Sequence, residues 1–204
     1  MVEGSQIDWG GHAASTIYIV EDMLDFALDV QPYGVERWLA AFAEATPDPT
    51  PLEQALLAWD LQLTTTSTGA LKYAYWRFAL AEHEQGSAIR EAIDDHYALA
   101  AGREPKAVAL SASQQRVLRN TYAQAMQTMQ DELGTLEAPW GRVFRVARGA
   151  GSWPVGGGGG DEYGLTTLRT VGYEAPDENF VRKGNRGQTS TQVVDSTRAS
   201  TSRL

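Results

Sequence analysis

The chain has 204 residues, a length at which a single hydrophobic core usually forms one domain, so two independent catalytic domains are not expected. Apolar residues make up 43% of the chain and charged residues 21%, a balance that excludes wholesale disorder. The net charge of -9 argues against general binding to nucleic acids or anionic membranes, because both need a basic surface. The absence of cysteine excludes disulfides, a thiolate nucleophile and Cys-ligated zinc.

The charge is unevenly distributed along the chain. Residues 1–100 contain 16 acidic and 4 basic residues, a net charge of -12, whereas residues 101–204 contain 10 acidic and 13 basic residues, a net charge of +3. We interpret the acidic half as the solvated faces of helices. No apolar run approaches the roughly 20 residues of a membrane span, and the first thirty residues contain no Lys or Arg, unlike a signal peptide.

The first two thirds of the chain predict helices. Residues 20–28 and 35–43 each carry apolar side chains at the i, i+3, i+4, i+7 spacing of an amphipathic helix, and Pro32 separates them. Thr50 and Glu53 predict a capping box at the start of a third helix, with Pro51 in its first turn. The apolar stripe of this third helix is predicted to be Leu52, Leu56, Trp59 and Leu63. We expect Trp59 to enter the core and Asp60 to contact polar partners in residues 64–68.

Residues 70–81 are apolar on nearly every side, so this helix is expected to be buried on several sides. Its aromatic residues suit either an acyl-binding pocket or a plain hydrophobic core, and the core is the commoner outcome. Residues 89–100 predict another amphipathic helix. Ser111 and Gln114 predict a capping box for the longest helix, which Gly134 would end after residue 133.

From Pro139 onward the chain is rich in glycine and loses the helical period. Strands are predicted at residues 143–147, 165–171 and 192–196, with turns at the glycine run 156–160 and at Pro176-Asp177. Three short strands with open edges bury little surface by themselves. The pattern is therefore typical of part of an α+β domain.

No sequence motif identifies an active site. Gly156 to Gly160 lack the Lys and Ser or Thr of a phosphate-binding loop, and Asp161-Glu162 would repel an anion, so a close-packed turn is favoured. His12, His83 and His96 have no metal-ligand spacing, and His96 fits the edge of a core. The chain also lacks the G-x-S-x-G pattern of a hydrolase nucleophile.

Four segments in order resemble the C-terminal part of the β chain of the penicillin amidase family, closest to its acyl-homoserine-lactone acylase and aculeacin acylase branch. The resemblance covers roughly residues 50–196. Its segments are Leu56-Leu57-Ala58-Trp59-Asp60, Ala138-Pro139-Trp140-Gly141-Arg142-Val143, Pro154-Val155-Gly156-Gly157-Gly158, and Gly187-Gln188-Thr189-Ser190 to Val193-Val194-Asp195.

The resemblance implies an N-terminal-nucleophile hydrolase, an αββα sandwich that cleaves the carbon–nitrogen bond of an acyl amide such as penicillin or an N-acyl-homoserine lactone. In that family a processed Ser at the start of the β chain is the nucleophile. Ser5 lacks the family's flanking sequence, so we expect the nucleophile outside this chain. We therefore assign no catalytic, cofactor-binding or metal-ligating residue, and expect no cofactor.

The expected organisation is one incomplete domain: a helical segment without a family motif (1–49), a helical packing layer (50–134), and a Gly-rich strand and loop segment (135–204). Its expected partners are the α chain, the N-terminal part of the β chain, and an acyl amide substrate; nucleic acid and membrane are not expected. The resemblance implies a periplasmic or secreted location. A stand-alone helical binding module with a Gly/Arg-rich tail, or a complete small enzyme, remains an alternative.

Overall fold

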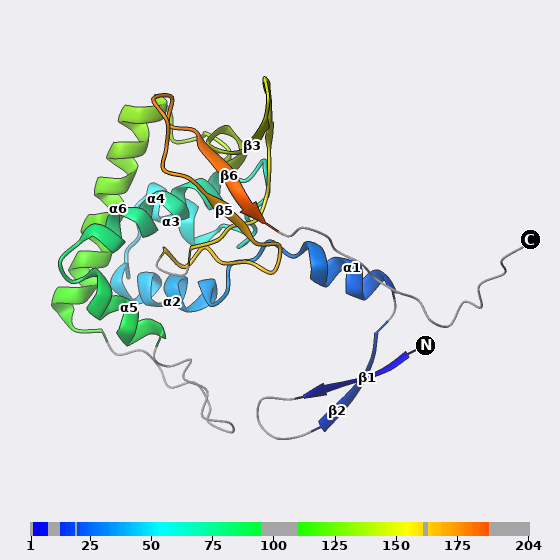
Figure 1. Cartoon of the computed structure of the whole chain (residues 1–204). Coiled ribbons are helices and arrows are strands. Elements are labelled where there is room, and N and C mark those ends of the chain that lie inside the picture. Colours follow the sequence, from blue (N-terminus) through cyan, green and yellow to red (C-terminus); the bar gives the residue numbers. More distant parts are fainter. Residues whose placement is uncertain (1, 8–12, 19, 95–109, 161–162, 188–204) are drawn as a thin grey trace, which may run out of the picture.

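The computed structural model describes residues 2–7, 13–18, 20–94, 110–160 and 163–187 (Figure 1). The fold over these residues is α+β, as the sequence predicted. Its elements are β1 (Val2–Ile7), β2 (Ala13–Tyr18), α1 (Val20–Leu28), α2 (Val35–Ala45), α3 (Pro51–Leu57), α4 (Thr68–Glu82), α5 (Gly86–Asp94), α6 (Ala112–Leu133), α7 (Trp140–Val143), β3 (Phe144–Arg148), β4 (Gly151–Pro154), β5 (Val171–Tyr173) and β6 (Arg182–Gly187).

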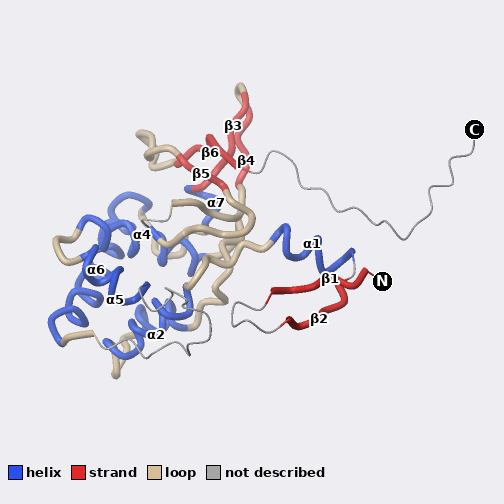
Figure 2. The backbone as a smooth tube through the Cα atoms, turned by 60° about the horizontal axis from the view of Figure 1, so that its bottom comes forward, coloured by secondary structure: helices blue, strands red, loops and turns tan. Residues whose placement is uncertain are grey.

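The elements form three groups in space. Helices α2 to α6 make a compact cluster, and a four-stranded sheet lies at one end of that cluster (Figures 1 and 2). Helix α1 and the antiparallel β1–β2 hairpin lie away from the cluster in both views. None of the described helices is long and apolar enough to span a membrane.

The four-stranded sheet has the order β4-β3-β6-β5. Strands β3 and β4 form an antiparallel hairpin, and β5 pairs antiparallel with β6. The central pairing of β3 with β6 is parallel and sets Phe144 opposite Arg182. This pairing places residues 182–187 beside β3, and it brings Arg182 close to α4 and α6.

Helix boundaries follow the capping residues that the sequence predicts. At α3 the Thr50 hydroxyl accepts from the Glu53 amide at 3.3 Å, and the Glu53 carboxylate accepts from the Thr50 amide at 2.8 Å. Ser111 and Gln114 form the same reciprocal pair at α6, which ends at Gly134 with a φ of 71°. These bonds satisfy amide groups that the first helical turn leaves without partners.

The core of the helical cluster is aromatic and is centred on Trp76 of α4. The rings of Phe42 and Tyr122 lie 4.8 Å and 6.2 Å from the Trp76 ring, each edge to face. The indole N–H of Trp76 donates to the carbonyl of Leu118 at 3.2 Å, so its one polar atom is satisfied although the side chain is fully buried. A second aromatic group forms under the sheet, where Trp140 stacks on Phe144 at 3.7 Å.

The prediction of a helix buried on several sides is confirmed for α4. Residues 69–77 are all buried, because α4 packs mainly along α6 and also against α3, α5 and α7. This chain itself supplies the surfaces that bury these residues. Large exposed apolar side chains lie instead on α1, where Met23, Leu24, Phe26 and Leu28 are 43–54% exposed.

Other expectations need correction. Segment 1–49 is not helical throughout, because residues 2–7 and 13–18 form a hairpin whose second strand contains the β-branched Thr16 and Ile17. The helical cluster begins before residue 50, because α2 packs against α6. The apolar stripe of α3 does not reach Trp59 and Leu63, since the helix ends at Leu57; both side chains are buried from the loop that follows.

The strand half was only partly predicted. Strand β3 confirms the strand predicted at 143–147, whereas 165–171 is a strand only from Val171 onward. The preceding residues are held in a loop because Thr167 Oγ1 accepts from the Gly158 amide at 3.0 Å and donates to the Arg169 carbonyl at 2.7 Å. The strand predicted at 192–196 lies outside the described residues. Strand β6, with the sequence RKGNRG, has no strand-favouring residue and depends on its neighbours.

Candidate functional site

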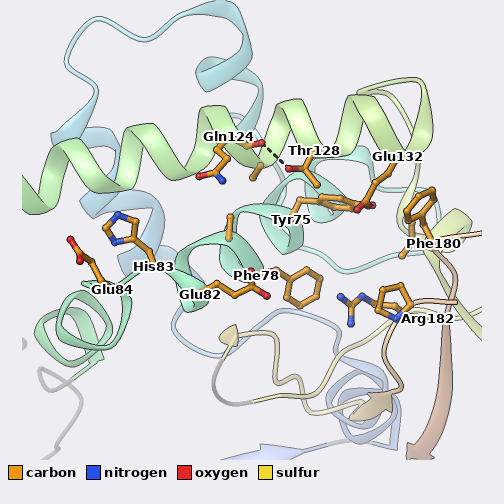
Figure 3. A pocket seen from close by; sticks show the side chains of 14 residues that line it. Tyr75, Phe78, Glu82, His83, Glu84, Gln124, Thr128, Glu132, Phe180 and Arg182 are labelled. Carbon is orange, nitrogen blue, oxygen red and sulfur yellow. Dashed lines mark hydrogen bonds between the residues drawn. The ribbon is translucent and has the colours of Figure 1, made fainter. Parts of the chain in front are cut away.

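A cavity of about 500 Å³ lies between α4, α6 and the beginning of β6 (Figure 3). Its volume falls in the range of small-molecule sites, about 300 to 1,000 Å³. Tyr75, Phe78, Ala79 and Glu82 of α4 form one wall, and Gln124, Ala125, Thr128 and Glu132 of α6 form the other. The remaining lining residues are His83, Glu84, Val143, Pro176, Phe180 and Arg182.

The helix spacing explains why α4 contributes both to the core and to the cavity. Tyr75, Phe78, Ala79 and Glu82 recur three or four residues apart and so share one face. Tyr73 and Trp76 lie on the other side and are fully buried in the core. The aromatic residues of this helix therefore serve both purposes that the sequence left open: one face lines the cavity and the other face packs in the core.

Tyr75 and Glu132 form a hydrogen-bonded pair in the wall of the cavity. The Tyr75 hydroxyl donates to Glu132 Oε2 at 2.7 Å. Burial of the phenol, together with this carboxylate, raises the pKa of Tyr75 above its ordinary value, so Tyr75 is a neutral donor at physiological pH. The bond joins α4 to α6 and fixes Glu132 at the wall of the cavity.

Arg182 is the cation of the cavity. Its guanidinium lies over the Phe78 ring at 4.2 Å from the centroid. Burial lowers the pKa of Arg182, while the nearby hydroxyl groups of Tyr163 and Tyr75 and the carboxylates of Glu132 and Glu82 oppose that effect. Tyr163 meets Phe78 edge to face at 4.9 Å, which holds the ring beneath the guanidinium.

Phe180 lines the cavity from a strained turn. Its φ is 61°, a left-handed conformation that costs a non-glycine residue roughly 1 to 2 kcal/mol. Asp177 holds the turn, because its carboxylate accepts from the amides of Asn179 and Val181 at 3.0 Å each. These two backbone bonds are the main cause that keeps the pKa of Asp177 below its ordinary value.

The other end of the cavity carries His83 and Glu84 (Figure 3). His83 Nδ1 accepts from the Gln85 amide at 3.1 Å, so this nitrogen serves the turn after α4. Within the described part of the chain, no group of three or more His, Asp or Glu residues is placed to hold a metal ion. His12 and His96 lie outside the described residues.

The glycine run forms the close-packed loop that the sequence favoured. Gly156, Gly157 and Gly158 are buried, and the Gly157 and Gly158 amides donate to the Leu63 carbonyl at 2.9 Å and to Thr167 Oγ1 at 3.0 Å. Gly157 has a φ of +86°, and a side chain there would collide with the Arg169 carbonyl. These amides bind the protein itself, whereas a phosphate loop would direct them toward a ligand.

A smaller cavity of about 190 Å³ lies beside α5 and is lined by Trp38, Arg77 and Arg90 among others. The guanidinium of Arg77 stacks on Trp38 at 3.3 Å from the ring centroid, and its Nη1 lies 3.2 Å from the Tyr73 hydroxyl. Gly164, with a φ of +62°, lies against this guanidinium, and a Cβ atom at that position would be 2.9 Å from Arg77 Nη1. Arg77 is thus a packed element of the core.

The sequence offered the aromatic residues of 70–81 as one possible acyl-binding pocket, but it singled out neither Arg182 nor Glu132 as a binding residue. The cation that lines the cavity lies in a strand that lacks strand-favouring residues, and Glu132 reads from the sequence as one more polar residue of a long helix. Only the helical face shared by Tyr75 and Phe78 was visible as a pattern.

Comparison with known proteins identifies the family of this chain. No curated protein matches the chain. The sequence model of the penicillin amidase family matches residues 12–204, which includes residues 12–49, where no family motif was recognised. The match covers far more than half of the sequence, so the chain belongs to the penicillin amidase family.

Proposed function

We propose that this chain is part of an acylase that hydrolyses the carbon–nitrogen bond of an acyl amide, with the nucleophilic Ser on a segment outside this sequence. The observation that carries the proposal is the family match over residues 12–204. Penicillins and N-acyl-homoserine lactones are the substrate classes to test first, because the sequence segments resemble the acyl-homoserine-lactone acylase branch most closely.

The roles of Ser67, Ser111 and Ser152 support a nucleophile elsewhere. Ser67 accepts from the Ala70 amide at 3.1 Å and from the Trp59 indole at 3.0 Å, so it serves a helix start and the core. Ser111 caps α6, and Ser152 accepts from Arg145 Nε at 2.9 Å. A nucleophilic serine would instead need a base within hydrogen-bond reach.

The exposed face of α1 supports the proposed partner, which is the rest of the acylase: the α chain and the N-terminal part of the β chain. Met23, Leu24 and Leu28 are all more than two-fifths exposed on this helix. Contiguous exposed apolar residues commonly mark a surface that another segment covers.

The family assignment also supports a periplasmic or secreted location, which fractionation of the producing cell would test.

A stand-alone binding module is the rival function. The burial of residues 69–77 of α4 within this chain favours it, because the helical cluster covers this part of its own core. The exposed apolar face of α1 opposes it. The two proposals differ in whether amide hydrolysis appears when the other acylase segments are present.

The deciding experiment measures amine release from phenylacetyl amides and N-acyl-homoserine lactones. The chain is assayed alone and after coexpression with the α chain and the N-terminal part of the β chain. We expect no turnover by the chain alone and turnover by the assembled protein. Hydrolysis by the chain alone, abolished by a serine-directed acylating inhibitor, would contradict the proposal. Failure of the segments to copurify would favour the binding module.

A further inference from the structure

The cavity between α4 and α6 has a guanidinium available for a ligand. Within the described residues, no hydrogen bond or ion pair engages the side chain of Arg182, whose guanidinium lies over the Phe78 ring. A half-buried guanidinium attracts an anion strongly, because its two parallel N–H groups match the geometry of a carboxylate. The side chain therefore offers a carboxylate site at the edge of an aromatic wall.

The acidic groups of the cavity restrict what that carboxylate can belong to. Glu132 already accepts from Tyr75 through Oε2, and among the described residues no donor engages its other oxygen, which can accept a further hydrogen bond. Glu132 and Glu82 both lie near enough to Arg182 to act on its charge. A ligand that carried only a carboxylate would be repelled by these two groups, whereas a ligand that also carried an ammonium would be attracted by them.

The apolar surface indicates the body of the ligand. Phe78 is fixed by Tyr163 at 4.9 Å, and Phe180 is held at the rim by the strained turn at Asp177. Figure 3 shows both rings at the same end of the cavity as Arg182 and Glu132. Aromatic faces held in this way suit a flat apolar group.

We propose that this cavity binds a free aromatic α-amino acid, whose carboxylate pairs with Arg182, whose ammonium pairs with Glu132, and whose ring packs against Phe78 and Phe180. Neither the family match nor the proposed hydrolysis assigns a ligand to these residues. The readout is binding, so the proposal stands or falls whether or not the assembled enzyme cleaves amides.

The first test needs no mutation and uses calorimetric titration of the full chain. L-phenylalanine is compared with 2-phenylethylamine, which lacks the carboxylate, with 3-phenylpropanoate, which lacks the ammonium, and with L-alanine, which lacks the ring. We expect L-phenylalanine to bind about tenfold more tightly than 2-phenylethylamine and than 3-phenylpropanoate, the size of one charge-assisted hydrogen bond. We also expect it to bind more tightly than L-alanine, which has no ring to bury. Equal affinities, or no binding of L-phenylalanine, would overturn the proposal.

N-acetyl-L-phenylalanine separates this site from a substrate site, because it keeps the carboxylate and the ring but turns the ammonium into an amide. We expect it to bind as weakly as 3-phenylpropanoate. Binding as tight as that of L-phenylalanine would overturn ammonium recognition and point to an acyl amide as the occupant.

Two variants assign the charges, each with a matched control on the same element. Arg182→Gln should abolish the preference for L-phenylalanine over 2-phenylethylamine, whereas Arg186→Gln, at an exposed position of β6, should keep it. Glu132→Gln should abolish the preference over 3-phenylpropanoate, whereas Asp131→Asn, an exposed neighbour on α6, should keep it. Preferences that survive both substitutions would place the amino acid elsewhere.

Discussion

Helices α1 and α4 show two different relations between an apolar sequence and its burial. Helix α4 is apolar on nearly every side, and α6 with its neighbours buries residues 69–77, whereas Phe78 and Ala79 at the cavity are only half-buried. Helix α1 is amphipathic in sequence, yet its large apolar residues are 43–54% exposed. The apolar period of a helix thus shows which face favours burial, whereas the fold decides whether the same chain supplies the covering surface.

The largest expected effect is a loss of stability on mutation of the buried core around α4, compared with mutation of the exposed face of α1. Trp59→Ala should reduce the free energy of unfolding by about 3 to 5 kcal/mol, because the ring packs against Tyr73 at 5.2 Å and its indole donates to Ser67. Leu24→Ala on α1 should change it by no more than about 0.5 kcal/mol, as expected for an exposed site. Chemical denaturation midpoints measure both, and equal losses would contradict the comparison.

A smaller change tests how tightly α4 is enclosed. Alanine normally stabilises a helix by roughly 1 kcal/mol relative to glycine. At Gly69, however, a Cβ atom would lie 2.5 Å from the Trp59 ring, so Gly69→Ala should instead destabilise the protein by about 1 to 3 kcal/mol. Thermal unfolding gives the sign, and a gain in stability would show that Trp59 is free to move aside.

An acid titration tests the bond that joins the start of α3 to α6. Burial alone would raise the pKa of Glu53, but the Thr50 amide and Arg119 outweigh it and hold the pKa below its ordinary value. Glu53 therefore stabilises the fold fully above the unfolded pKa, about 4.3, and this contribution is lost as the pH falls through the lower folded pKa.

The matched variant for that titration is Glu53→Gln, followed by thermal unfolding from pH 7 to pH 3. We expect a constant stability difference from the unchanged protein above about pH 5 and a shrinking difference below it. A difference that does not depend on pH would show that the charge of Glu53 is unimportant.

The smallest effect on stability is expected on α1. Leu24→Gln combined with Leu28→Gln should change the free energy of unfolding by less than about 1 kcal/mol, because both positions are exposed and Gln favours helices nearly as well as Leu. Self-association and binding of a hydrophobic dye should nevertheless fall, as light scattering and fluorescence would measure. If the unchanged chain is a monodisperse monomer that binds no dye, the inference that another segment covers the apolar face of α1 is wrong.

Local signals in the sequence predicted the helices well. The capping pairs at Thr50 and Ser111 and the stop at Gly134 act within a few residues, so their bonds could be anticipated without knowing the fold. Strand β6 could not be anticipated, because its residues have little strand preference and their pairing with β3 is set by distant parts of the chain.

The cavity depends on the same distant pairing. The face shared by Tyr75 and Phe78 follows from helix spacing, but only the β3–β6 pairing brings Arg182 over Phe78. The strained φ of Phe180 is equally hidden, since a phenylalanine rarely adopts it. The sequence therefore predicted the wall of the cavity that α4 forms, but it could not predict that Arg182 lies beside this wall.

The position of β6 in the middle of the sheet also has a consequence for folding during synthesis. The β3–β4 hairpin joins neighbouring residues and can form soon after it leaves the ribosome, whereas the parallel contact of Phe144 with Arg182 requires a long loop to close. Until residues 182–187 emerge, β3 and β5 have no strand between them. Before β6 is synthesised, one edge of β3 and one edge of β5 therefore have no pairing strand. We expect aggregation to be most favoured at this stage of synthesis, because unpaired strand edges can pair with other chains.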